Sequence, residues 1–262
     1  SRCEMKRLAL LLLLLAGPLL RAQEEVLSRV DSLVDNYTAF ISRESAEVKK
    51  GECDYLIGSL ADTVMKARVA SRLYGIYSGS RVMGDESVAI YLWDKWLSDK
   101  TLPMPSEEDW LDAKMFAEFN RNSLLGMQAP CLKMRRPCMG SRIFPRPGRN
   151  AIIFFYDTDC GKCKLESAVL PSVMKDWNVR TDFYAVYVGS DKSKWRTWRR
   201  EFRLDNPRVR VFHLWDPEVD SDFIRNYGVL STPKLFLIDS DGRIRGRRLE
   251  VENLLQLLPY VQ

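Results

Sequence analysis

Apolar residues recur every three or four positions through the first part of the chain, from Glu24 to about Gly126. This spacing is typical of helices that bury one face. Four segments show it, over residues 26–41, 55–77, 85–96 and 106–124. Ser106 is followed by three acidic residues, which predicts that the last helix begins there. The first segment carries Val26, Val30, Leu33, Val34, Tyr37, Phe40 and Ile41 on one stripe, which we expect to pack against the other helices.

The pattern changes after Gly126. Residues 127–156 contain no acidic residue and several Pro and Gly, which predicts an extended segment. Apolar runs that predict strands then alternate with helical segments. The strands are expected at 151–156, 183–188, 209–214 and 234–238, with a hairpin partner at 243–247; the helices at 163–176, 193–202, 221–227 and 250–258. We therefore expect an α+β protein, with an all-α domain of unassigned role over residues 23–126 and an α/β domain with a mixed sheet over 127–262.

The first residues have the order of a secretory signal peptide, namely positive charge, an apolar run and small residues. From Met5 the chain reads MKRLALLLLLLAGPLLRAQ, and its uncharged run of 13 residues is shorter than the ~20 that span a bilayer. We expect residues 5–22 to be a signal peptide, with a retained N-terminal anchor as the alternative. Loss of residues 1–22 would lower the formal charge from +5 to +2, which removes the main support for a nucleic-acid partner.

Five cysteines remain after residue 22, and Cys160 and Cys163 form a C-x-x-C pair directly after a predicted strand. A cysteine at a helix start is stabilised as the thiolate by unpaired N–H groups and the helix dipole. Cys160 is therefore expected to attack a disulfide, and Cys163, one turn later, to resolve the mixed disulfide. The odd count predicts that at least one thiol is free or pairs with another molecule.

A second feature stands 70 residues further on, where Ser231-Thr232-Pro233 precedes a predicted strand. Proline cannot donate a hydrogen bond within a sheet and is typical of a strand start. A cis bond before Pro233 would expose the backbone of Thr232 to an incoming peptide.

With these features the sequence resembles thioredoxin-fold proteins of the exported TlpA/ResA-like branch. The matching stretches are "AIIFFYDTDCGKC", "YGVLSTPKLFLIDSDGRI" and "LLGMQAPCLKM", so the resemblance covers about residues 127–262. The helical part resembles, more loosely, a domain that precedes thioredoxin domains in secreted Gram-negative proteins.

The resemblance implies a periplasmic thiol–disulfide oxidoreductase that acts on protein thiols and disulfides together with a redox partner protein. Cys160 and Cys163 would form its redox-active disulfide, and Glu166 would assist proton transfer. Thr232 and Pro233 would contact the substrate backbone. It implies no dissociable cofactor, no metal and no nucleic acid, and membrane contact only through an uncleaved signal segment.

Three positions depart from thioredoxins proper. Phe154 stands where they carry a buried acid, Asp159 where they carry tryptophan, and Lys162 where proline is common. The charge of Asp159 should raise the pKa of Cys160, whereas Lys162 should lower it.

Other assignments remain open at this point. Cys131 and Cys138 are close enough in sequence for a loop disulfide, and with Cys160 and Cys163 they could bind zinc. The basic, aromatic segment 192–203 is expected to be a solvated helix on which Trp195 and Trp198 pack inward, rather than a nucleic-acid helix. His213, the only histidine, is expected to be structural.

The alternative function is a thioredoxin-fold binding protein whose Cys160–Cys163 disulfide is structural. An exposed, reactive Cys160 would favour the enzyme, and a buried, inert pair would favour the binding protein.

Overall fold

The computed structural model describes residues 24–138 and 140–261. Contacts between residues divide the described chain into two compact units. The first comprises residues 24–80 and 88–113, and the second comprises residues 81–87, 114–138 and 140–261. The predicted signal peptide, residues 5–22, lies outside the described residues. None of the helices in the described ranges combines the length and the apolar character that a membrane crossing needs.

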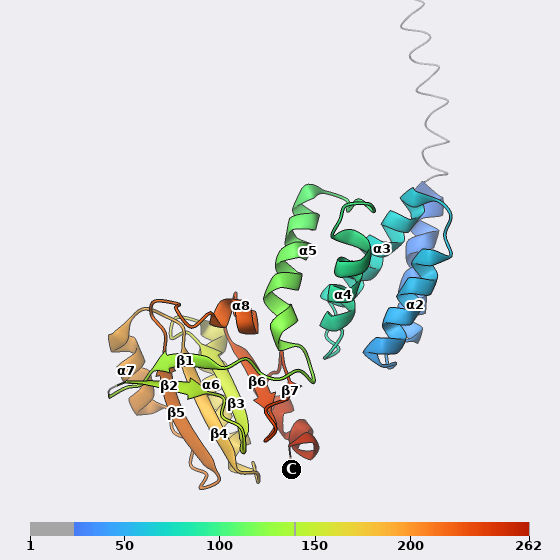
Figure 1. Ribbon diagram of the computed structural model, residues 1–262. Helices are drawn as coiled ribbons and strands as arrows, with labels where there is room; N and C mark the ends of the chain where they lie inside the picture. The colour runs from blue at the N-terminus through green and yellow to red at the C-terminus, as the bar shows by residue number, and fades with distance from the viewer. Residues whose placement is uncertain (1–23, 139, 262) are drawn as a thin grey trace, which may run out of the picture. The chain divides into compact units, whose positions relative to one another are not determined.

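The first unit is built from helices (Figure 1). Residues 24–40 are helical, and the helices that follow are α2 (Ala46–Gly58), α3 (Thr63–Ser78), α4 (Glu86–Leu92), the π-helical turn η1 (Trp93–Leu97) and α5 (Glu107–Asn120), which extends into the second unit. Ion pairs from Arg68 to Asp31 and from Arg72 to Asp35 join α3 to helix 24–40. Ile57, Leu73, Leu92 and Leu97 are fully buried between the helices.

Two expectations for this unit were wrong. The segment 55–77 is two helices, because Asp62 caps α3 by accepting a hydrogen bond from the backbone N–H of Met65 at 2.7 Å. In the first helix, fewer of the regularly spaced apolar residues are buried than the spacing predicts. Val34 and Ile41 are buried, but Leu33 is 68% exposed and Phe40 is 86% exposed.

The second unit contains a seven-stranded mixed sheet in the order β2-β1-β5-β4-β3-β6-β7 (Figure 1). Its strands are β1 (Leu132–Arg135), β2 (Ser141–Phe144), β3 (Asn150–Tyr156), β4 (Thr181–Tyr187), β5 (Val209–Trp215), β6 (Lys234–Ile238) and β7 (Ile244–Gly246). β3, β4 and β5 are parallel, whereas β6 and β1 join this centre antiparallel on its two sides. The expected fold class, helices followed by an α/β mixed sheet, is confirmed.

Both faces of the sheet are covered, which explains why its central strands are continuous apolar runs. Ile152, Phe154 and Tyr156 of β3 face a core that includes Leu170 and Met174 of α6 (Gly161–Lys175). Alternate residues of β3 face a second core with α8 (Phe223–Tyr227) and β1. The remaining elements are η2 (Arg121–Ser123), α7 (Lys192–Glu201) and η3 (Val251–Tyr260), a 3₁₀ segment where an α-helix was expected.

Helix α7 packs through its tryptophans, as expected. Trp195 is 2% exposed, and Trp198 stacks on Tyr156 with ring centroids 3.9 Å apart. The rings of Trp198 and Phe202 contact His213 of β5 edge-on. Burial, reinforced by nearby arginines, lowers the pKa of His213 to about 4.

The neutral imidazole of His213 predicts a loss of stability in acid. In the unfolded chain the pKa of this histidine is near 6.5. The unfolded chain therefore binds a proton below pH 6.5, whereas the folded chain binds it only near pH 4. The free energy of unfolding should therefore fall as the pH drops from 6.5 toward 4, by about 2 kcal/mol for this group. Urea unfolding at pH 7.5 and 4.5 should show this extra loss in the wild type and not in His213→Phe. Equal losses in both proteins would contradict it.

Candidate active site

The C-x-x-C pair lies at the junction of β3 and α6. β3 ends at Tyr156, and Cys160 is the N-cap of α6, with an extended backbone (φ −76°, ψ 117°). Its Sγ accepts a hydrogen bond from the backbone N–H of Cys163 at 3.0 Å. Because the first N–H groups of a helix have no partner within it and the dipole favours negative charge there, this position stabilises a thiolate at Cys160.

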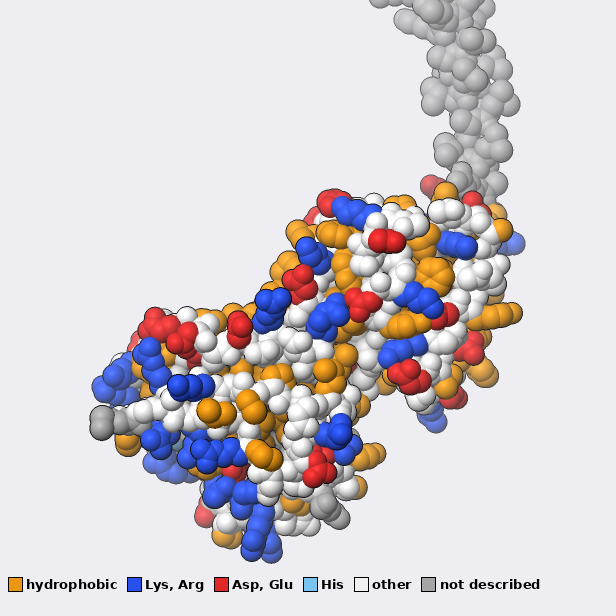
Figure 2. All heavy atoms as spheres, viewed as in Figure 1, with side chains coloured by type: hydrophobic (Ala, Val, Ile, Leu, Met, Phe, Trp, Pro, Cys, Tyr) orange, Lys and Arg blue, Asp and Glu red, His pale blue; other side chains and the backbone are white. Residues whose placement is uncertain are grey.

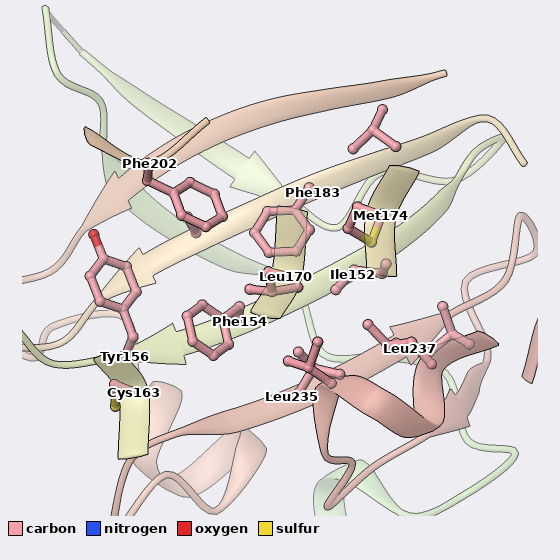
Figure 3. Close-up of a cluster of buried hydrophobic side chains, with 14 of the residues drawn as sticks. Ile152, Phe154, Tyr156, Cys163, Leu170, Met174, Phe183, Phe202, Leu235 and Leu237 are labelled. Atoms are coloured by element: carbon pink, nitrogen blue, oxygen red, sulfur yellow. The ribbon is translucent and has the colours of Figure 1, made fainter. Parts of the chain in front are cut away.

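The two cysteines differ in accessibility. They form a disulfide with Cα atoms 5.2 Å apart. Cys160 is half-buried, whereas Cys163 is 1% exposed and lies in the core beside Tyr156 (Figure 3). Thus Cys160 is the sulfur of the pair that another protein can reach.

The Thr232-Pro233 segment lies against this pair. The Thr232 carbonyl oxygen is 3.4 Å from Cys160 Sγ, although 72 residues separate them in sequence. The Thr232–Pro233 peptide bond is cis, and β6 begins at the next residue. Segments far apart in sequence, which the sequence analysis singled out separately, thus meet at one end of the sheet.

Glu166 lies one turn after Cys163 on the inner side of α6. It is 8% exposed, and its Oε2 accepts a hydrogen bond from the backbone N–H of Val251 at 2.9 Å. Burial raises the pKa of this carboxyl above its usual range, and the Val251 N–H and the positive charge of Lys162 only partly oppose the shift. A carboxyl of this kind holds a proton at higher pH than an exposed one and can exchange it with a nearby thiol.

Both charged residues that flank Cys160 have partners that sequence analysis did not identify. Asp159 pairs with Lys194 of α7 at 2.8 Å, and hydrogen bonding by Lys194 lowers the pKa of Asp159. Lys162 pairs with Glu250 at 3.0 Å. The charge of Asp159 therefore opposes a Cys160 thiolate less than the sequence alone suggests. No local signal points to Lys194, which lies 35 residues away in a segment rich in basic residues.

Removing Lys194 should slow the reaction of Cys160. In Lys194→Gln the carboxylate of Asp159 is unpaired and disfavours the neighbouring thiolate, so alkylation of the reduced protein by iodoacetamide at pH 6 should slow about two- to threefold. Lys192→Gln, which removes an exposed lysine of the same helix, should leave the rate unchanged, and Asp159→Asn in the Lys194→Gln background should restore it. Equal rates for the two lysine variants would show that the pair has no influence on Cys160.

Lys234, the first residue of β6, is a further residue that sequence analysis missed. Its pKa is lowered by burial and by the positive charges of Arg248, Arg247 and Lys162. It directly follows Pro233, so a basic group lies beside the predicted substrate-contacting residues.

The other cysteines do not join this site. Cys53 is 1% exposed in the helical unit, and burial raises its pKa to about 12, so it is a poor nucleophile. Cys131 and Cys138 are exposed and unpaired in the structure. Within the described ranges, no three His, Cys, Asp or Glu side chains gather in a way that could hold a metal ion.

A mixed sheet, a helix that begins on a C-x-x-C pair and a facing strand preceded by cis-proline define the second unit as a thioredoxin-like fold. Residues 142–262 match the family described as a thioredoxin-like domain. Comparison with curated proteins finds no match.

Solved structures with a similar fold include several from Bacteroides. A thioredoxin-like protein from Bacteroides caccae is 12% identical with a TM-score of 0.66, over 90% of this chain and 84% of that one. The thioredoxin domain of a thiol-disulfide oxidoreductase from Bacteroides vulgatus is 17% identical with a TM-score of 0.46, over 53% of this chain and 98% of that one. A thiol:disulfide interchange protein from Bacteroides sp. is 18% identical with a TM-score of 0.45, over 53% of this chain and 90% of that one.

Proposed function

We propose that this protein is an exported thiol–disulfide oxidoreductase that acts on protein disulfides through Cys160 and Cys163. The observation that carries the proposal is the position of Cys160, which is accessible, caps α6 and lies against the Thr232 carbonyl, with Cys163 buried behind it. A disulfide with only a structural role does not need one accessible sulfur placed where a thiolate is stabilised.

In the reducing direction, the thiolate of Cys160 attacks one sulfur of the substrate disulfide. The substrate S–S bond breaks, its other sulfur leaves as a thiolate that takes up a proton, and a mixed disulfide forms. Cys163 then loses its proton and attacks Cys160 Sγ, which breaks the mixed disulfide and releases the second substrate thiol. Two electrons pass from the cysteine pair to the substrate, and the oxidising direction is the reverse.

Glu166 is the group proposed to exchange the proton of Cys163. It lies one helical turn away on the same side of α6, and burial raises the pKa of its carboxyl, which makes the carboxylate a stronger proton acceptor than an exposed one. The backbone of Thr232 and the ring of Pro233 are proposed to align an extended substrate segment beside Cys160, because backbone groups at a strand end can pair with a peptide.

The wider assignment follows from the same residues. Glu166 three positions after Cys163 supports the TlpA/ResA-like branch, and the signal-like residues 5–22 support a periplasmic location. The reaction needs no dissociable cofactor, because the electrons reside in the cysteine pair. A redox partner protein is required to return the pair to its starting state.

Insulin reduction tests the proposal. With dithiothreitol as the electron donor, the full-length mature protein should accelerate the precipitation of insulin chains well above the rate with dithiothreitol alone. Binding of insulin without acceleration would favour the alternative, a thioredoxin-fold binding protein with a structural disulfide.

A further inference from the structure

Four arginines surround one buried carboxylate in a cavity of the second unit. The cavity has a volume of about 430 Å³ and is lined by Arg142, Arg146, Pro147, Arg149, Asp182, Arg210 and Phe212. These residues come from β2, the connection to β3, and the N-terminal halves of β4 and β5. Figure 2 shows Lys and Arg side chains gathered over the part of this unit where β2 and β5 lie in Figure 1.

Asp182 holds two of the arginines. It is 3% exposed and accepts hydrogen bonds from Arg149 Nε at 2.9 Å and from Arg210 Nε and Nη2, each at 2.8 Å. The hydroxyl of Tyr184 also donates to it at 3.3 Å. One carboxylate thus fixes the positions of two guanidinium groups at the start of the central strands.

The other two arginines lack such a partner. The guanidinium of Arg142 lies 4.0 Å from the ring centroid of Phe212, and its buried Nε has no hydrogen-bond partner among the residues that the structure describes. Arg146 is exposed on the same cavity, and within the described ranges it forms no ion pair with an acid. The lining therefore contains four guanidinium groups and a single carboxylate, which leaves three positive charges uncompensated.

A buried donor without a partner and an excess of like charges both cost free energy that a bound anion would offset. Guanidinium groups present planar pairs of donors that match the oxygens of phosphate and sulfate. The half-buried ring of Phe212 adds an apolar wall, as expected for a small organic ligand rather than a bare ion. The geometry points to a binding site for a small soluble molecule that carries a phosphate or sulfate group, held by Arg142 and Arg146 with Arg149 and Arg210.

This site is separate from the cysteine pair. Arg149, Asp182 and Arg210 lie at the N-terminal ends of β3, β4 and β5, whereas Cys160 follows the C-terminal end of β3. Seven strand residues at ~3.3 Å each place about 20 Å between them. The inference therefore does not depend on the proposed redox function.

Inorganic phosphate is the probe that tests it. Calorimetric titration of the full-length mature protein should show saturable phosphate binding that sodium chloride at equal ionic strength does not reproduce. Arg142→Gln/Arg146→Gln should weaken this binding at least tenfold. Neither arginine pairs with Asp182, so the double variant leaves the buried carboxylate with its partners. Arg196→Gln/Arg225→Gln, which removes two exposed arginines elsewhere in the same unit, should change the affinity less than twofold.

Two further measurements keep the test decisive. If the double variant fails to fold, Arg146→Gln alone, on an exposed connection, should still weaken binding. In the wild type, phosphate should shift the NMR signals of the guanidinium groups of Arg142, Arg146, Arg149 and Arg210 and not that of Arg196. No saturable phosphate binding, or equal weakening in the control variant, would overturn the proposal. Arginine-dependent binding to phosphatidic acid vesicles without binding of free phosphate would also overturn it, in favour of a lipid surface.

Discussion

Replacing Cys160 by serine is expected to abolish disulfide exchange, lowering insulin reduction by about a thousandfold or more. Cys160 is the accessible sulfur, and its Sγ accepts a hydrogen bond from the Cys163 N–H at the start of α6, where a thiolate is stabilised. A serine hydroxyl at the same place cannot form the mixed disulfide. Cys163→Ser should also lose turnover but for a different reason, because the mixed disulfide forms and is not resolved.

The two variants are distinguished on non-reducing gels. Cys163→Ser should accumulate covalent adducts with substrate proteins that dithiothreitol releases, and Cys160→Ser should form none. Cys131→Ser, which removes an exposed cysteine outside the site, is the matched control and should retain wild-type activity. Adducts formed by Cys160→Ser but not by Cys163→Ser would reverse the assigned roles.

Phe154→Ala is expected to destabilise the second unit by about 3–5 kcal/mol. Phe154 is fully buried in the middle of β3, stacked on Tyr156 and near Phe183. Figure 3 shows it beside Leu170 of α6, the helix that carries the cysteine pair. Loss of the ring leaves a cavity between the central strand and this helix, which close packing cannot fill without strain.

The measurement is the free energy of unfolding of the oxidised protein in urea, with unfolding monitored by near-ultraviolet circular dichroism. Leu165→Ala is the control, because Leu165 lies on α6 but is 71% exposed, and its loss should change stability by less than about 0.5 kcal/mol. Similar effects of the two substitutions would mean that Phe154 does not contribute to the core between β3 and α6.

The central strands were predictable because burial on both faces requires unbroken apolar runs. β3, β4, β5 and β6 lie within two residues of the predicted positions. β1 and β2 were missed as strands. Each has four residues with polar positions, and β1 joins the sheet by pairing with β5, some 80 residues away, which no local pattern reveals.

In the helical unit, the apolar pattern predicted more buried residues than the structure has. Leu33 and Phe40 fit the helical spacing of core residues but are exposed, because spacing identifies a face without showing what covers it. The extent of the helical region was predictable, while its division at Asp62 depended on a capping hydrogen bond that competes with the apolar pattern.

The candidate site was predictable where chemistry is encoded locally. The C-x-x-C pair, its position at a helix start and the proline before a strand are all visible in the sequence. Lys194, Glu250 and Val251 contact Asp159, Lys162 and Glu166 from 35 to 88 residues away, and only the fold brings them together.

The most direct test of the account is the reduction potential of the Cys160–Cys163 disulfide. The protein, with Cys131 and Cys138 replaced by serine, would be equilibrated in glutathione and dithiothreitol redox buffers, and the fraction of reduced pairs measured by thiol alkylation and mass spectrometry. We expect one two-electron transition between about −270 and −120 mV, the range of thioredoxin-fold proteins that exchange disulfides. A pair that stays oxidised until below about −300 mV would be a structural disulfide, and would contradict the assignment of this protein as an oxidoreductase.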